Sequence, residues 1–307
     1  NIDPAAMQDK FNDFTGKTPG ELYEEAVFSN DQGYTLNQSF PAGVNISASD
    51  IHTIIYYDTY DYIERFNYDF APPQELSMNE RLLYPQGMVT GSQTRILGTD
   101  EFLVTVKYYD TKGRLIQQHK ENHLGGMDVI SNEYDFSGNL LTSKRVHTLR
   151  ETPPLELWKF FHYDHADRLI RKEHQIGNNP ANRVVLADME YNERGEVITK
   201  KLHSPVGQSE FLQKIDYKYN IRGWMKEMNE PDNAKEKEDL FSMKLAYTGG
   251  LEIIDNPQYN GNIAAMIWKT LDHGISASQE KRNLKNTTIS GEEISAGNEI
   301  TVQPETT

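Results

Sequence analysis

Three aspartates recur in one sequence context and are the strongest candidates for acid–base chemistry in this chain. Asp110, Asp135 and Asp164 each follow a tyrosine, in "YDTKGRLI", "YDFSGNLL" and "YDHADRLI". Two later copies of the phrase carry Asn192 and Asn220 at the same place. An amide cannot carry a proton but can hold a turn as well as a carboxylate does. The substitution therefore argues against proton transfer and favours turn formation.

Other candidates for chemistry are weaker. His119 and His123, in "HKENH", have the spacing of a zinc pair on a helix, but the glutamate of His-Glu-x-x-His is missing. The stretch also follows a strand-like segment, so an exposed loop is the better interpretation. "TGKT" from Thr15 lacks the earlier glycine of a phosphate-binding loop. The acidic stretch "NEPDNAKEKED" from Asn229 lacks the alternation of a calcium-binding loop, so a solvated insertion is favoured.

Composition excludes several classes of function. The 307 residues include 31 basic and 46 acidic side chains, a formal net charge of -15, which disfavours nucleic acid and anionic membranes as partners. No cysteine is present, which removes thiol catalysis and disulfides, and no Gly-x-Ser-x-Gly nucleophile motif occurs. No apolar run reaches the roughly 20 residues of a membrane helix. We therefore expect no enzymatic activity, no cofactor, no metal and no membrane span.

The tyrosine phrase is an internal repeat. It starts at Tyr109, Tyr134, Tyr163, Tyr191 and Tyr219, at intervals of 25, 29, 28 and 28 residues. Strand-like residues precede each copy, and an aliphatic residue or methionine begins the return two residues after the turn. Each copy is therefore predicted to be a β-hairpin, and because one hairpin is marginal alone, neighbouring hairpins are expected to stack into a sheet.

Each turn needs a residue that tolerates a positive φ angle, four positions after the tyrosine. Four copies have glycine there and the third has an aspartate, which tolerates this region better than most residues. The predicted turn residues are Tyr109, Asp110, Gly113, Tyr134, Asp135, Gly138, Tyr163, Asp164, Asp167, Tyr191, Asn192, Gly195, Tyr219, Asn220 and Gly223.

The Tyr-Asp-x-x-Gly-Arg-Leu unit resembles the YD repeat of the rearrangement-hotspot (RHS) family, whose relatives include toxin-complex shell proteins and teneurins. Flanking phrases such as "YYDTYDYI", "NHLGGMDVISNEYDFSGNLL" and "NPQYNGNIAAMIWK" resemble a bacterial surface-protein branch of that family. The resemblance implies an all-β, curved or spiralling sheet of hairpins that forms part of a shell. It also implies an extracellular or cell-surface location, with the rest of a larger RHS-type polypeptide and a toxin payload as partners.

The chain departs from the family pattern in one respect. The paired Asp-Pro-x-x-Gly motifs of the family's self-cleavage segment are absent, so neither self-proteolysis nor a payload is carried over. We expect three parts: residues 1–19 as a vector-derived scar ("NIDPAA") and lead-in, which leaves room for an export signal upstream, residues 20–275 as the repeat domain, and residues 276–307 as a polar extension. Alternating Ile and Val in that extension favour short β-rungs over a disordered tail.

A glycan- or protein-binding surface is the alternative to a structural role. Aromatic rings stack on sugars as well as in cores, and Trp158, Trp224 and Trp268 lie in or beside strand-like stretches. Exposed rings gathered in one groove favour binding, whereas buried rings favour a scaffold.

Overall fold

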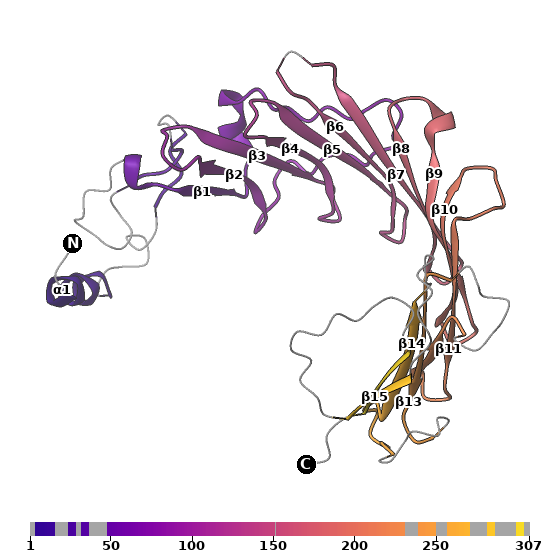
Figure 1. Ribbon diagram of the computed structural model, residues 1–307. Helices are drawn as coiled ribbons and strands as arrows, with labels where there is room; N and C mark the ends of the chain where they lie inside the picture. The colour runs from indigo at the N-terminus through magenta and orange to yellow at the C-terminus, as the bar shows by residue number, and fades with distance from the viewer. Residues whose placement is uncertain are drawn as a thin grey trace. The chain divides into compact units, whose positions relative to one another are not determined.

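The computed structural model describes residues 4–15, 24–28, 32–36, 48–150, 152–230, 239–249, 257–270, 281–285 and 299–303. Within these ranges almost every element is a β-strand (Figure 1). The exceptions are the helix α1 (Pro4–Thr15) and the short 3-10 helices η2 (Ala48–Asp50), η3 (Asp61–Arg65) and η4 (Pro180–Asn182). No helix in the described part of the chain is long and apolar enough to cross a membrane.

The chain divides into two compact units. The first unit contains residues 1–160 and 176–178, and the second contains residues 161–175 and 179–307. From β1 to β7 in the first unit and from β8 to β14 in the second, the strands form an antiparallel meander, in which each strand pairs with its neighbours in the sequence. The predicted all-β architecture of stacked hairpins is therefore confirmed.

The first unit holds six complete strands and most of a seventh. They are β1 (Thr53–Tyr57), β2 (Val89–Arg95), β3 (Phe102–Tyr109), β4 (Leu115–Glu121), β5 (Met127–Tyr134), β6 (Leu140–His147) and β7 (Leu155–Tyr163), paired in that order. Side chains alternate between the two faces along each strand, so one face of β1, for example, carries the buried Ile54 and Tyr56.

The second unit continues the same pattern. Its antiparallel strands are β8 (Leu169–Ile176, except its last residue), β9 (Val184–Tyr191), β10 (Val197–Pro205), β11 (Gln213–Tyr219), β12 (Met225–Met228), β13 (Phe241–Ala246) and β14 (Ala265–Thr270). β16 (Glu299–Gln303) pairs antiparallel with β14, and β15 (Lys281–Lys285) pairs in parallel with β16. Both of these last strands lie in the stretch that the sequence marks as a polar extension.

The core of the first unit lies between the sheet and a long connection. Residues 59–86, here called the inserted segment, join β1 to β2 and contribute Tyr62, Ile63 and several half-buried aromatic rings to this core. The sheet contributes Tyr56, Val106, Tyr108, Ile116 and their neighbours. The repeat pattern did not predict this layer, because the inserted segment contains no copy of the repeat.

Candidate functional site: the repeated tyrosine joint

Each repeat forms a tight joint between two strands, and Asp110 illustrates its geometry. The Asp110 N–H donates to the Arg114 carbonyl at 3.0 Å, and the Gly113 N–H donates to the Asp110 carbonyl at 2.9 Å. The Asp110 side chain then accepts the N–H groups of Lys112 and Arg114, both at 2.9 Å. Gly113 has φ of 76°, a left-handed conformation in which a side chain is strained. Local backbone bonds and one carboxylate thus close the turn.

The other joints repeat this arrangement whether the central residue is aspartate or asparagine. In every one the side-chain oxygen accepts the N–H four residues on, with distances of 2.8 Å for Asp135, 3.0 Å for Asp164, 3.0 Å for Asn192 and 3.0 Å for Asn220. The residues at positive φ are Gly138 (102°), Asp167 (57°), Gly195 (83°) and Gly223 (79°). The amide therefore makes the same turn contact as the carboxylate, which is the role that the sequence comparison assigned to it.

The tyrosine of the joint has a second contact that sequence reasoning missed. The Tyr134 hydroxyl donates, at 3.0 Å, to the carbonyl of Leu115, a residue of the preceding hairpin. Equivalent bonds join Tyr191 to Leu169 at 2.8 Å and Tyr219 to Val197 at 3.0 Å. Each acceptor is the first residue of the previous return strand. The tyrosine therefore ties its own hairpin to the one before it, in addition to ending the outgoing strand.

The same contact reveals a joint that is interrupted. Tyr109 donates to the Val89 carbonyl at 2.8 Å, so β1 and β2 form the hairpin that precedes the first recognised repeat. The Asp58 N–H donates to the Met88 carbonyl at 3.2 Å, Gly87 has φ of 75°, and its N–H donates to the Asp58 side chain. The bond from the Asp58 N–H and the positive φ of Gly87 match a normal joint. The Met88 N–H, however, donates to the Pro85 carbonyl and not to the aspartate side chain, and the inserted segment separates Asp58 from Gly87.

A sequence signal for this joint was available. Residues 56–59 read "YYDT", identical to residues 108–111, although the glycine expected two positions later is displaced. A related case stands at the end of the meander, where the Tyr247 hydroxyl donates to the Met225 carbonyl at 2.9 Å. Residues 248–264 lie between Tyr247 and the return strand β14, in the place of the short turn of an ordinary joint. The interrupted copies escape a search for the uninterrupted phrase.

Basic side chains link some joints to the following joint, in the opposite direction along the sequence. Arg114 donates to the Asp135 carbonyl at 2.8 Å and lies over the Tyr134 ring, 5.0 Å from its centroid. Arg168 makes the corresponding bond to the Asn192 carbonyl at 3.3 Å. A tyrosine hydroxyl thus bonds to the preceding hairpin, and an arginine side chain bonds to the following hairpin. The hairpin of Tyr109 and Arg114 carries both contacts and is hydrogen-bonded to both neighbours.

The joint carboxylates are held in the charged form. Burial raises the pKa of Asp110, but hydrogen bonds from the Arg114 side chain, two backbone N–H groups and Asn79 outweigh it, and the net pKa lies below the ordinary value. Chiefly through the hydrogen bond from Arg168, the pKa of Asp164 is lowered to about 2. A carboxylate with such partners is a poor proton donor or acceptor near neutral pH, so these acids suit architecture.

The low pKa of Asp164 predicts an acid-dependent loss of stability. Because the folded state favours the charged form, the contribution of Asp164 is fully present above about pH 4, the ordinary range of the carboxyl group, and is lost as pH falls toward 2. Asp164→Asn, which copies Asn192, is expected to show a smaller decrease in stability over that range. Urea unfolding at pH 5, 3 and 2 measures this, and equal acid dependence in both proteins would contradict the assignment.

The two histidines of "HKENH" are not brought together. His119 lies inside β4 and is buried, with its ring stacked on Tyr68 at 6.1 Å, so the expectation of an exposed loop is wrong for this residue. β4 includes His119 because this residue pairs with Val106 of β3 and Val129 of β5, and Tyr68 of the inserted segment covers its ring. Burial lowers the pKa of His119. In the described residues, no group of three or more His, Asp or Glu side chains is arranged to hold a metal ion.

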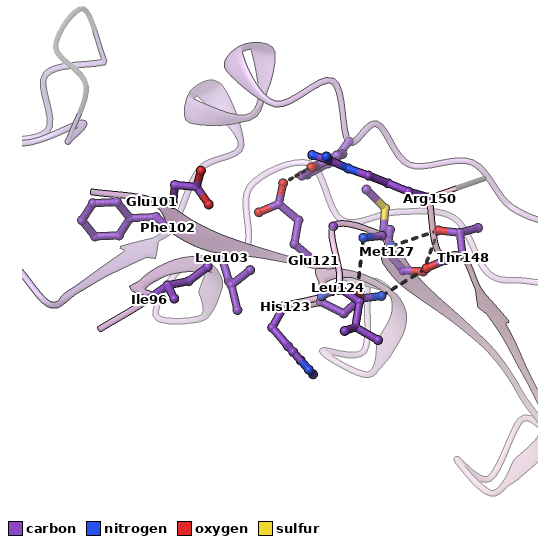
Figure 2. A pocket seen from close by; sticks show the side chains of 14 residues that line it. Ile96, Glu101, Phe102, Leu103, Glu121, His123, Leu124, Met127, Thr148 and Arg150 are labelled. Carbon is purple, nitrogen blue, oxygen red and sulfur yellow. Dashed lines mark hydrogen bonds between the residues drawn. The ribbon is translucent and has the colours of Figure 1, made fainter. Parts of the chain in front are cut away.

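His123 instead lines a groove in the first unit (Figure 2). The groove lies at the opposite strand ends from the joints. The groove has a volume of about 710 Å³ and is bordered by the turn between β4 and β5, the start of β3 and Arg150. Glu121 lies inside it but accepts hydrogen bonds from the Tyr68 hydroxyl and from the Val104 N–H. Its carboxylate therefore holds the inserted segment against the sheet.

A second groove, of about 700 Å³, lies beside the third joint in the second unit. Its charged groups are paired with one another, since Arg168 contacts Asp164 at 2.6 Å and Arg171 contacts Glu173 at 3.0 Å. The rest of the lining includes aliphatic residues and Tyr191, and also two further acids. Of these, Asp188 contacts Arg171 at 3.9 Å and Glu190 contacts Lys201 at 2.6 Å. The acids of this groove belong to structural ion pairs.

The three tryptophans pack against neighbours. Trp158 is only 8% exposed, and the Lys144 ammonium lies 4.6 Å from its ring centroid. Trp224 and Trp268 are half-buried and lie beside Tyr247 and Phe241, with ring centroids 5.0 Å and 6.2 Å apart. Among the described residues, the aromatic side chains that are more than half exposed are Phe136, Tyr84 and Tyr259, which lie on three separate turns or connections. These rings do not share a groove.

The described strands and joints define an all-β array of antiparallel hairpins connected by tyrosine and arginine contacts. No protein-family profile matches the chain, and no curated protein matches it. Among solved structures it is similar to a chain of the Photorhabdus luminescens Tc holotoxin pore with a TccC3 mutation, at TM-score 0.32 and 15% identity over 59% of this chain and 10% of that chain. It is also similar to the TcdB2–TccC3 complex, at TM-score 0.29 and 16% identity over 72% of this chain and 12% of that chain.

The chain therefore spans about a tenth of the length of these structural neighbours. Because the TM-scores are low, we base the proposed function on the joints and on the sequence repeat, and not on these neighbours.

Proposed function

We propose that this chain is a structural segment of an extracellular or surface YD-repeat protein, in which it builds part of a β-shell or scaffold. The observation that carries the proposal is the ladder of tyrosine hydroxyl bonds, each from one hairpin to the hairpin before it. Ladder bonds and cross-strand contacts stabilise a sheet of this kind without any ligand. The role is mechanical, and we propose no reaction.

The partners of such a segment are the remaining repeats of a longer polypeptide and any payload or adhesive domain that the complete shell encloses or displays. The repeat phrase supports this proposal, as does a surface charge that is strongly acidic, which suits a soluble extracellular protein better than a nucleic-acid-binding one. The ion pairs of the second groove fit the same role, because Asp164, Glu173 and Glu190 are each held by a basic side chain.

A glycan-binding module is the alternative, and the packing of the tryptophans gives it less support. Sugar stacking needs an open ring, whereas Trp158 is almost wholly buried and is covered by Lys144. If glycans are the ligand, screening the protein on a glycan array should give saturable binding that Phe136→Ala or Tyr84→Ala removes. Binding of this kind would replace the scaffold proposal.

The scaffold proposal predicts that the tyrosine hydroxyls contribute to stability. Tyr191→Phe keeps the ring but leaves the Leu169 carbonyl without its hydroxyl donor, so the free energy of unfolding should fall by about 1 kcal/mol. Tyr219→Phe should have a similar effect. Chemical denaturation monitored by circular dichroism measures both.

Tyr259→Phe is the matched control, because this ring is 70% exposed and lies on a connection. It should leave the unfolding midpoint unchanged. If the joint variants are as stable as the control, the tyrosine ladder does not hold the array together and the proposal loses its main support.

A further inference from the structure

The inserted segment covers one face of the first strands through closely fitted aromatic rings. The Tyr62 ring stacks on Tyr56 with centroids 4.0 Å apart, and the Tyr60 ring stacks on Tyr108 at 4.9 Å. Tyr62 reaches this depth because β2 has Gly91 beneath it: a Cβ atom there would lie 2.1 Å from the Tyr62 hydroxyl oxygen. The face of the sheet is therefore shaped to receive this segment.

Two polar side chains of the sheet, Gln117 and Asp110, are hydrogen-bonded to the segment. The Gln117 amide donates to the Ala71 carbonyl at 2.8 Å and accepts the Ala71 N–H at 3.0 Å, which copies the pairing of two strands. Asn79 donates to the carboxylate of Asp110 at 3.0 Å, which connects the inserted segment to the next joint. Buried polar atoms that lack partners are costly, so these bonds fix the segment in one position on the sheet.

The outer side of the segment has the opposite character. Tyr62, Ile63 and Leu76 point into the core and are buried. The exposed positions of the same segment are mostly polar or charged: Asp61, Glu64, Arg65, Asn67, Asp69, Gln74, Glu75 and Glu80. The segment thus converts an aromatic sheet face into a hydrophilic surface.

The outer edge of β1, which faces away from β2, also has a hydrogen-bond partner. Ladder bonds alternate along an antiparallel strand, and the bond from the Arg95 N–H to the His52 carbonyl sets the phase, so Ile55 turns its backbone groups away from β2. The Tyr34 hydroxyl donates to the Ile55 carbonyl at 2.9 Å, and the Tyr56 hydroxyl donates to the Gln32 carbonyl at 2.9 Å. Tyr34 and Gln32, in the described residues 32–36, thus lie beside the edge strand.

We propose that residues 59–86, together with residues 24–28 and 32–36, form an end cap that closes the hairpin array at β1. The inference rests on the proposed scaffold role, because an array of stacked repeats needs a terminal element with a polar outer side to stay soluble. An uncovered edge strand is a template for pairing with another chain, and an uncovered aromatic face is a site of association. The cap blocks both at this end of the sheet.

The test removes the cap and restores an ordinary joint. Replacing residues 60–86 by one lysine gives Asp58-Thr59-Lys-Gly87, which copies the sequence Asp110-Thr111-Lys112-Gly113. The variant is expected to form larger species than the unaltered chain at equal concentration in sedimentation velocity, and to increase the fluorescence of the dye ANS several-fold. A variant that keeps its strand content by circular dichroism but shows no increase in size or dye binding would overturn the proposal.

A second variant covers the case in which the shortened chain does not fold. Tyr62→Glu places a carboxylate in the apolar core and should detach the segment without changing its length, which limited proteolysis within residues 59–86 detects. The expected result is cleavage accompanied by association and dye binding, and cleavage without either would again overturn the cap. Tyr84→Glu, at a ring that is 75% exposed in the same segment, is the control and should change none of the three.

These outcomes separate the cap from the scaffold. If Tyr191→Phe lowers stability while the cap variants do not associate, the array remains a scaffold and only the end cap is rejected. If the joint variants are as stable as the Tyr259→Phe control, the scaffold itself is rejected, whatever the cap variants do.

Discussion

Replacing Asp110 by alanine is expected to lower the free energy of unfolding by about 3 to 5 kcal/mol, the range measured when one partner of a buried ion pair is removed. The Asp110 side chain is 1% exposed and lies 2.6 Å from the Arg114 guanidinium, which is itself 15% exposed. It also accepts hydrogen bonds from Asn79 and from two backbone N–H groups. The alanine variant leaves all of these donors, and one buried positive charge, without their acceptor.

Two further variants identify the cause of the loss. Asp110→Asn can still accept the backbone N–H groups, as Asn192 does, so it should lose less than Asp110→Ala. Asp135→Ala removes a joint carboxylate whose side-chain partner is the amide of Asn139, with no ion pair, and should also be milder. Chemical denaturation at pH 7 compares the three. Equal losses for Asp110→Ala and Asp135→Ala would show that the buried ion pair adds nothing to the turn.

The contrast between these two joints indicates what the sequence could predict. The turn itself was predictable because its bonds lie within five residues, and the presence of Asn192 at the position equivalent to Asp135 already argued against proton transfer. The burial of Asp110 was not predictable from the repeat, because it depends on Asn79 and on the rest of the inserted segment. A turn depends on a few consecutive residues and can be predicted from them, whereas burial depends on residues that are distant in the sequence.

The tyrosine contacts follow the same rule. A tyrosine at the end of a strand suggests cross-strand packing, but its hydrogen-bond acceptor lies 19 residues earlier for Tyr134 and 22 residues earlier for Tyr191. The length of the repeat predicts this separation between donor and acceptor only when it is known which hairpins lie side by side. The first joint was missed for a related reason, since the inserted segment separates Asp58 from its glycine. An identical "YYDT" at both places was the one available signal.

The second large effect is expected at Tyr108, where the sheet meets the inserted segment. Its side chain is fully buried between Tyr60 and Phe70, with ring centroids at 4.9 Å and 5.5 Å, and its hydroxyl donates to the Tyr68 carbonyl at 2.6 Å. Tyr108→Ala removes the ring from the centre of the core and is expected to cost about 3 to 5 kcal/mol, the range for a buried aromatic residue changed to alanine.

Tyr108→Phe separates the ring from the hydroxyl group. It keeps the aromatic packing and loses one hydrogen bond, so its cost should be about 1 kcal/mol, with up to about 3 if the Tyr68 carbonyl finds no other donor. Tyr57→Ala, at the 46% exposed ring that ends β1, is the matched control for truncation of a tyrosine and should cost less than Tyr108→Ala. Hydrogen exchange adds a spatial readout, because loss of the Tyr108 ring should raise exchange in β3 and in the inserted segment while β10 and β11 stay protected. Uniform exchange over both units would contradict a core confined to the first unit, and a cost for Tyr108→Ala equal to that of Tyr57→Ala would contradict the burial on which the end cap depends.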